Sequence, residues 1–214
     1  MEKENILNKT MYDFSKGIEI MQAIILGLIA LLVPTFLAKL IASVFGAGSV
    51  ITQNSQLIVG SVVNTALIVA AINLKGWKKI VGIVTMPSVS TILSGYVFKS
   101  ASVYMAYMIP AIWIGNFVLI YAYKKILVEK KMNYFLAGVV GVILKVLVIF
   151  AGFELLNVFG VFPQKLVATL QTAMSTTQAI TATIGVLITF VIYEIEKHTL
   201  KEKNKKININ NFTD

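Results

Sequence analysis

The sequence predicts an all-α integral membrane protein with six membrane-spanning helices and both termini in the cytoplasm. The 214 residues are 57% hydrophobic and 14% charged, with a mean hydropathy of +0.81, whereas soluble domains are about 45–50% apolar and about 25% charged. Six apolar runs are each long enough for a bilayer crossing, which takes roughly 20 residues. We therefore expect one membrane domain at residues 20–193, between a polar segment at 1–19 and a lysine-rich tail at 194–214.

The first three spans are predicted at residues 20–45, 57–74 and 80–98. The first run is too long for the core of a signal peptide and has no small-residue cleavage site, so we expect it to be retained as a span. The segment 46–56 is polar without any charge and is expected to be a loop. The run Lys-Gly-Trp-Lys-Lys at 75–79 is expected to form a tight charged turn.

The last three spans are predicted at residues 103–123, 134–153 and 167–193. A charged turn at 124–131 separates the first two of these, and a connection at 154–165 separates the last two. The first, third and fourth spans of the chain each contain one proline. Membrane helices tolerate proline where neighbouring helices satisfy the freed carbonyl groups.

The lysines predict the orientation of the chain. All 19 basic residues are lysine, and 15 of them lie in the two terminal segments and in the second and fourth connections. The opposite connections hold only Lys99 and Lys165, while Lys39 and Lys145 lie within spans. Because lysine is concentrated on the cytoplasmic side of membrane proteins, both termini are expected inside the cell. We expect a multi-pass protein of a bacterial plasma membrane, in contact with membrane lipid.

The composition excludes several functional classes. The chain has no cysteine, and its single histidine, His198, lies in the polar tail, so the spans offer no metal-ligand set and no cofactor is expected. No acid pair or histidine lies within the spans for general acid–base or metal chemistry, so we do not expect an enzyme. The lysines flank apolar runs, so their expected partner is the bilayer rather than nucleic acid.

Lys145 is the first candidate functional residue. It lies about eleven residues into the fifth span, roughly 17 Å from the start of that helix, and therefore near the middle of the membrane. Gly138, Gly141 and Gly152 share its helix face and would let another helix approach closely. No acidic residue lies within any span to pair with it. Lys145 either reaches outward or to backbone carbonyls in a packed bundle, or it binds an anionic group of a ligand.

Other polar residues at similar depth extend this candidate site. Gln171, Ser175 and Gln178 are spaced to form a stripe on the sixth span. These residues could be interhelical contacts, or they could converge with Lys145 in a small-molecule pocket. Two amides are further candidates, Asn64 in the second span and Asn116 in the fourth. Tyr107 could supply an aromatic wall.

The first span contains small residues at a spacing that allows close helix contact. Ala23 and Gly27 are four residues apart, with Ala30 one turn further along. Ala38 and Ala42 repeat the spacing in the other half of the span. Such pairs allow close approach of a helix, either within the fold or from a partner protein.

With these features the chain resembles the substrate-binding S components of energy-coupling factor (ECF) transporters. The resemblance rests on the six spans in about 200 residues, on Lys145 in a glycine-rich fifth span, and on three stretches. These are VGSVVNTAL at 59–67, MIPAIWIGN at 108–116 and QAITATIG at 178–185.

The resemblance implies a subunit that captures a small water-soluble vitamin or related organic molecule near the outer face. It also implies delivery inward with a coupling membrane subunit and two cytoplasmic ATPases. This chain has no P-loop for ATP. In that family small residues of the first helix contact the coupling subunit, which implies either Ala23 and Gly27 with Ala30, or Ala38 and Ala42, here. The N-terminal histidine motif of the nickel and cobalt branches is absent.

Two other functions compete with substrate capture. A non-catalytic membrane assembly or interaction protein would use its buried polar groups for packing alone. An ion-coupled secondary carrier would have inverted repeats and carboxylates near the midplane, and neither is visible in the sequence.

Overall fold

A computed structural model describes residues 5–46, 48–95, 97–98 and 101–210, with side chains described as far as residue 200. The described residues form helices and turns without a β-strand. The elements in chain order are η1 (Ile6–Asn8), α1 (Lys16–Phe45), α2 (Val50–Gln53), α3 (Ser55–Asn73), α4 (Trp77–Ser94), α5 (Ser102–Tyr123), η3 (Lys124–Glu129, a π-helical segment), α6 (Tyr134–Val158), α7 (Gln164–Met174) and α8 (Thr176–Asn210). The all-α prediction is confirmed.

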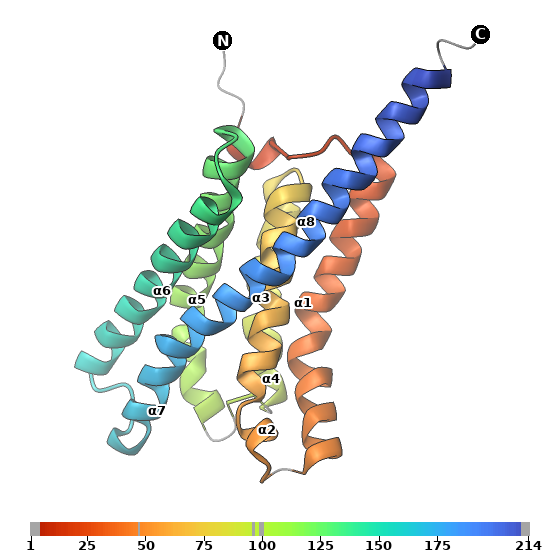
Figure 1. The fold of residues 1–214 in the computed structure, drawn as a ribbon. Coiled ribbons are helices and arrows are strands. Elements are labelled where there is room, and N and C mark those ends of the chain that lie inside the picture. Colours follow the sequence, from red (N-terminus) through yellow and green to blue (C-terminus); the bar gives the residue numbers. More distant parts are fainter. Residues whose placement is uncertain (1–4, 47, 96, 99–100, 211–214) are drawn as a thin grey trace.

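The long helices form a bundle around α3 (Figure 1). This helix packs against α1, α4, α5 and α8, and the most extensive helix pairs are α5 with α6 and α3 with α8. Local sequence sets several of the boundaries. The side chain of Asn133 accepts hydrogen bonds from the first amides of α6, at 2.7 Å from Phe135 and 3.3 Å from Leu136. Gly95, with a left-handed φ of 68°, ends α4.

Within the described part of the chain, five helical stretches are long and apolar enough to cross a membrane. They are Lys16–Phe45, Ser55–Asn73, Ser102–Glu129, Tyr134–Val158 and Gln164–Leu200. The predicted third span, α4, is not among them, because its 18 residues include Lys78, Lys79, Pro87 and several serines and threonines. α4 nevertheless runs beside α1 within the bundle (Figure 1). The sixth crossing therefore stays a prediction.

The sequence prediction was wrong at two connections. The predicted sixth span at 167–193 is not one helix, because the backbone leaves helical geometry at Ser175, with φ −113° and ψ −89°. The Ser175 hydroxyl donates to the Gln171 carbonyl at 2.6 Å, a local bond that competes with regular helix. The predicted loop at 46–56 contains the single turn α2, whose first turn is capped by Ser49.

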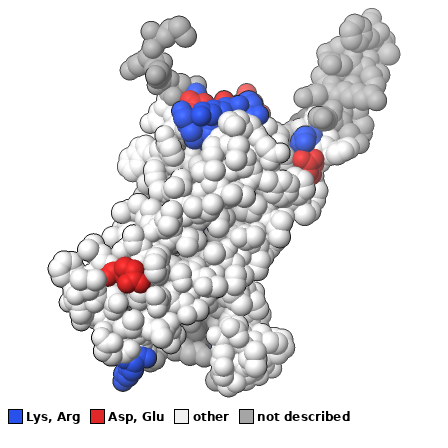
Figure 2. Space-filling model, turned by 60° about the vertical axis from the view of Figure 1, so that its left-hand side comes forward, with Lys and Arg blue, Asp and Glu red and all other residues white. Residues whose placement is uncertain are grey.

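The charges lie mainly at one end of the bundle. The N-terminal segment and the end of α8 share this end with the α3–α4 turn and with η3 (Figure 1). Figure 2 shows basic side chains concentrated there, while the flank of the molecule is almost free of charge. Lys165 lies exposed at the start of α7, at the opposite end. Lys99, the other lysine predicted on that side, lies outside the described residues.

The predicted orientation can be tested with single cysteines, because the chain has none of its own. Lys165 and Lys130 are both exposed and lie at opposite ends of the bundle. We expect Lys165→Cys to react with a membrane-impermeant maleimide on intact cells, and Lys130→Cys to react only after lysis. The reverse labelling pattern would invert the predicted topology.

Candidate functional site

A cavity of about 80 Å³ lies between α3, α4, α5, α6 and α8. Its apolar lining includes Val63, Met105 and Ile112. Its polar lining consists of amides, hydroxyls and one cation, contributed by Gln56, Asn64, Ser88, Thr91, Asn116, Lys145 and Gln178. An apolar cavity with a few converging polar groups is the usual form of a small-molecule site.

Lys145 points into the bundle and lines this cavity. Its side chain is 2% exposed, and its Nζ donates to Oδ1 of Asn64 at 2.5 Å. Asn64 is held in turn by two bonds of its amide nitrogen, to the Gly60 carbonyl at 2.8 Å and to Thr181 Oγ1 at 3.3 Å. Among the residues that the structure describes, no Asp or Glu contributes to the cavity lining. The ammonium therefore has a polar neighbour but no carboxylate beside it.

The glycines of α6 position Lys145 as the sequence predicts. A Cβ on Gly141 would lie 2.9 Å from Leu119 of α5, and a Cβ on Gly138 would lie 2.9 Å from Val186 of α8. Gly152 is similarly close to Ala111 of α5. This face of α6 therefore packs tightly against α5 and α8. Because Lys145 lies on the same face, its side chain points into the bundle.

Asn116 joins α5 to α4 at the same depth. It is buried, and its amide nitrogen donates to the Val84 carbonyl at 3.3 Å. One turn away, Trp113 Nε1 donates to Ser88 Oγ at 2.7 Å. The predicted residues Lys145, Asn64 and Asn116 are thus brought together around one cavity with Gln178.

Three predicted binding residues lie away from the cavity. Gln171 is exposed, and its amide nitrogen lies 3.5 Å from Oε1 of Glu154. Ser175 is bonded to the Gln171 carbonyl, and the helix break at this residue disrupts the predicted stripe. Tyr107 is 57% exposed on the outside of α5. None of the three belongs to the cavity lining in this structure, and their assignment as binding residues stays a prediction.

Sequence analysis missed three polar lining residues: Gln56, Ser88 and Thr91. Ser88 and Thr91 are three residues apart on the helix directly after Pro87, so helical spacing could have placed them on one face. Gln56 gave no such signal, because it lies at the border of an uncharged segment. It reaches the site through tertiary packing, and its amide nitrogen donates to the Ala173 carbonyl at 3.4 Å.

Three of the small residues predicted to contact a coupling subunit do not form one surface. Ala30 is fully buried against the bundle core, and the contact of these residues with a coupling subunit stays a prediction. Ala23 and Gly27 instead line a surface groove of about 300 Å³ between α1 and α4.

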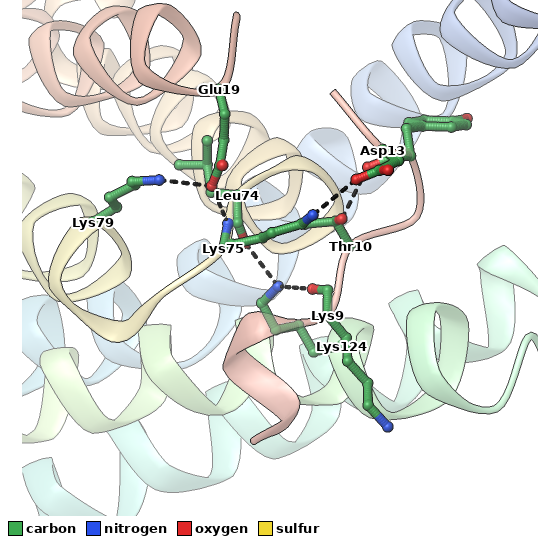
Figure 3. Close-up of polar contacts among 9 residues, drawn as sticks. Lys9, Thr10, Asp13, Glu19, Leu74, Lys75, Lys79 and Lys124 are labelled. Atoms are coloured by element: carbon green, nitrogen blue, oxygen red, sulfur yellow. Dashed lines mark hydrogen bonds and ion pairs between the residues drawn. The ribbon is translucent and has the colours of Figure 1, made fainter. Parts of the chain in front are cut away.

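The end of the bundle that holds the N-terminal segment is closed by a network of polar contacts (Figure 3). Lys124 is fully buried, and its Nζ donates to the Lys9 carbonyl at 2.6 Å and to the Leu74 carbonyl at 2.9 Å. Glu19 accepts from the Lys75 amide at 2.6 Å and from Lys79 Nζ at 2.7 Å.

The N-terminal segment is anchored in this network at further points. Met11 donates its amide to the Ile72 carbonyl at 2.9 Å. Asp13 accepts from Lys75 Nζ at 2.9 Å, and this bond holds the pKa of the Asp13 carboxyl below its usual value. The cavity lining, by contrast, continues to Gln56 at the start of α3 and to Val97 and Phe98 after α4. The cavity thus extends toward the end opposite the network (Figure 1).

The close packing beside Asn64 predicts a strong effect of a single methyl group. A Cβ on Gly185 would lie 2.6 Å from Asn64 Cβ and 3.0 Å from the Thr65 amide nitrogen. Because backbone atoms must then shift, we expect Gly185→Ala to lower stability by about 1–3 kcal/mol, measured from the thermal midpoint in detergent. Gly27→Ala is the matched control, since no atom lies within 4 Å of its Cβ position. Equal midpoints for the two variants would contradict the tight α3–α8 contact.

The described side chains contain no group of three His, Cys, Asp or Glu that could hold a metal ion. Comparison of the chain with protein families, curated proteins and solved structures finds no match.

Proposed function

We propose that this protein is a substrate-capture subunit of an ECF-type importer, which binds a small anionic organic molecule such as a water-soluble vitamin. The observation that supports it most directly is Lys145, a buried lysine in the wall of a cavity whose described lining residues include no carboxylate. An ammonium has three donor hydrogens, and Asn64 accepts one of them. A carboxylate or phosphate in the cavity would accept the others and compensate the charge.

The amides around the cavity would set the orientation of the ligand. Gln178, Gln56 and Asn116 come from three different helices and carry both donors and acceptors. The apolar side chains between them would exclude water and strengthen the electrostatic contact with Lys145. A cavity of about 80 Å³ lies below the roughly 300–1,000 Å³ of ligand sites. Capture of a vitamin therefore includes a widening of the cavity.

The proposed direction of transport follows from the two ends of the bundle. The cavity extends toward the end opposite the termini, which the lysine distribution predicts to be outside. The inner end is held closed by Lys124 and its partners. Inward release would need a coupling membrane subunit and two ATPases. The coupling subunit would meet the apolar outward side of α1, where Ile24, Leu28 and Leu31 are exposed.

A thermal-shift panel tests this proposal. Purified protein is heated with water-soluble vitamins that are carboxylates, phosphates, uncharged molecules or cations. We expect at least one anionic member to raise the midpoint, because a ligand at 100 times its Kd stabilises the folded state by about 2.7 kcal/mol. A shift given only by cationic members would contradict the assigned role of Lys145.

A second candidate function is a membrane assembly protein in which the same polar groups serve packing. The observation that favours it is that Lys145 bonds to Asn64, which itself links α3 to α8 through Thr181. A protein of this kind would give no midpoint shift with any member of the panel, and loss of the Lys145 ammonium would destabilise it.

A further inference from the structure

A groove on the membrane-facing surface lies apart from the cavity described above. It has a volume of about 300 Å³ and runs between α1 and α4. Its apolar wall consists of Ile20, Ala23, Ile24, Gly27, Ile83 and Met86. Gly27 opens directly into it, since no atom lies within 4 Å of its Cβ position. The groove is therefore a hollow that small residues leave on the outside of a packed helix pair.

The two helices that form the groove begin at the same level. Both run away from the end that holds the termini (Figure 1), and their first turns are joined by the ion pair of Lys79 with Glu19 at 2.7 Å. Ala23 and Gly27 lie one and two turns beyond Glu19 on α1. The groove therefore starts at the basic end of the bundle and continues into its apolar flank.

Positive charge lies where the groove meets this basic end. Lys78 lines the groove, is exposed and forms no ion pair among the described residues. Lys79 also lines it but is bound to Glu19. Trp77, which begins α4, is 57% exposed beside them, as expected for an aromatic residue at a membrane–water interface. An unpaired ammonium thus lies at one end of an apolar hollow.

We propose that this groove binds an anionic phospholipid, with an acyl chain against Ala23 and Gly27 and the phosphate group beside Lys78. Basic pockets between membrane helices bind anionic headgroups. Here the exposed Lys78 would complement the phosphate of such a lipid, and the apolar wall of the groove would complement its acyl chain. The small residues of α1 then have a role of their own, and this site stands independently of any ligand at Lys145.

Native mass spectrometry of the full-length protein in detergent tests the site. The probes are phosphatidylglycerol and phosphatidylcholine with identical acyl chains, and the charge variants are Lys78→Ala and its control, Lys130→Ala. Lys130 is exposed at the same end of the bundle but outside the groove. We expect Lys78→Ala to weaken phosphatidylglycerol binding about fivefold and phosphatidylcholine binding less, because the choline ammonium offsets the charge of its phosphate. Lys130→Ala should affect neither lipid.

A second variant tests the hollow itself. Gly27→Leu should fill the groove without internal clashes, keep the thermal midpoint of the wild type and reduce retention of both lipids. Millimolar inorganic phosphate should not displace the bound lipid. Equal effects of Lys78→Ala and Lys130→Ala, or unchanged lipid retention in Gly27→Leu, would overturn the proposal. A dimer of this chain that Gly27→Leu disrupts in the same spectra would also overturn it, because a second copy would then occupy the groove.

Discussion

Lys145→Met is expected to weaken binding of the captured anion by roughly 30- to 150-fold. This range corresponds to about 2–3 kcal/mol, the contribution of a hydrogen bond to a charged group. Methionine keeps most of the side-chain volume, so the cavity between α3, α5 and α6 keeps its shape while the one cation among its described lining residues is removed. Isothermal titration with the anion that shifts the thermal midpoint measures the change. Lys39→Met, on an exposed face of α1, is the matched control and should bind as the wild type does.

The stability of the same variant separates the two candidate functions. The buried ammonium of Lys145 destabilises the folded protein when no ligand is bound, because it is removed from water and no carboxylate among the described lining residues compensates its charge. If Lys145 serves ligand capture, unliganded Lys145→Met should melt no lower than the wild type. If Lys145 serves packing through Asn64, the variant should melt lower and bind the anion with unchanged affinity. That second result would contradict the capture account.

Lys124→Met is expected to cause the largest loss of stability, about 2–4 kcal/mol. The substitution leaves the Lys9 and Leu74 carbonyls without the donor that now bonds both of them, and each unsatisfied buried group costs about 1–3 kcal/mol. It also removes the anchor that joins the N-terminal segment to the ends of α3 and α5 (Figure 3).

Two measurements follow the effect of Lys124→Met. The thermal midpoint in detergent should fall, and backbone amides near Met11 should exchange faster with deuterium than in the wild type. Lys125→Met is the control, because the neighbouring lysine is partly exposed and its solvent-screened ion pair with Glu129 contributes little to stability. If Lys124→Met were as stable as Lys125→Met, the network at this end would not hold the bundle closed.

Hydrophobic runs were sufficient to predict most helices of this fold. The ranges 20–45, 103–123 and 134–153 lie within or closely match α1, α5 and α6, because continuous apolar sequence leaves few alternatives to helix in a membrane. The break at Ser175 was missed, because the polar residues around it, QTAMSTTQ at 171–178, were interpreted as part of one continuous helix. In α4, hydropathy underestimates the role of the helix. Its polar side chains lower its mean hydropathy, although it packs against other helices of the bundle.

The centre of the candidate site was also visible in the sequence. An intramembrane lysine on a glycine face predicts an inward side chain, and the structure places it beside Asn64. Tyr107 was proposed as an aromatic wall from its depth, which does not say which side of a helix faces the bundle. Gln171 was proposed from a polar stripe that assumed one continuous helix through Ser175. The contact of Lys124 with Lys9 joins residues 115 positions apart. Contacts of this kind arise from tertiary packing, which no local pattern in one sequence encodes.

Native mass spectrometry of wild-type protein and Lys145→Met, both purified without added ligand, measures whether the buried ammonium holds a cargo. The wild type is expected to retain one small organic anion, and Lys145→Met is expected to retain none. Retention of the same molecule by both proteins, or of an uncharged or cationic molecule by the wild type, would show that the buried ammonium does not recognise the cargo.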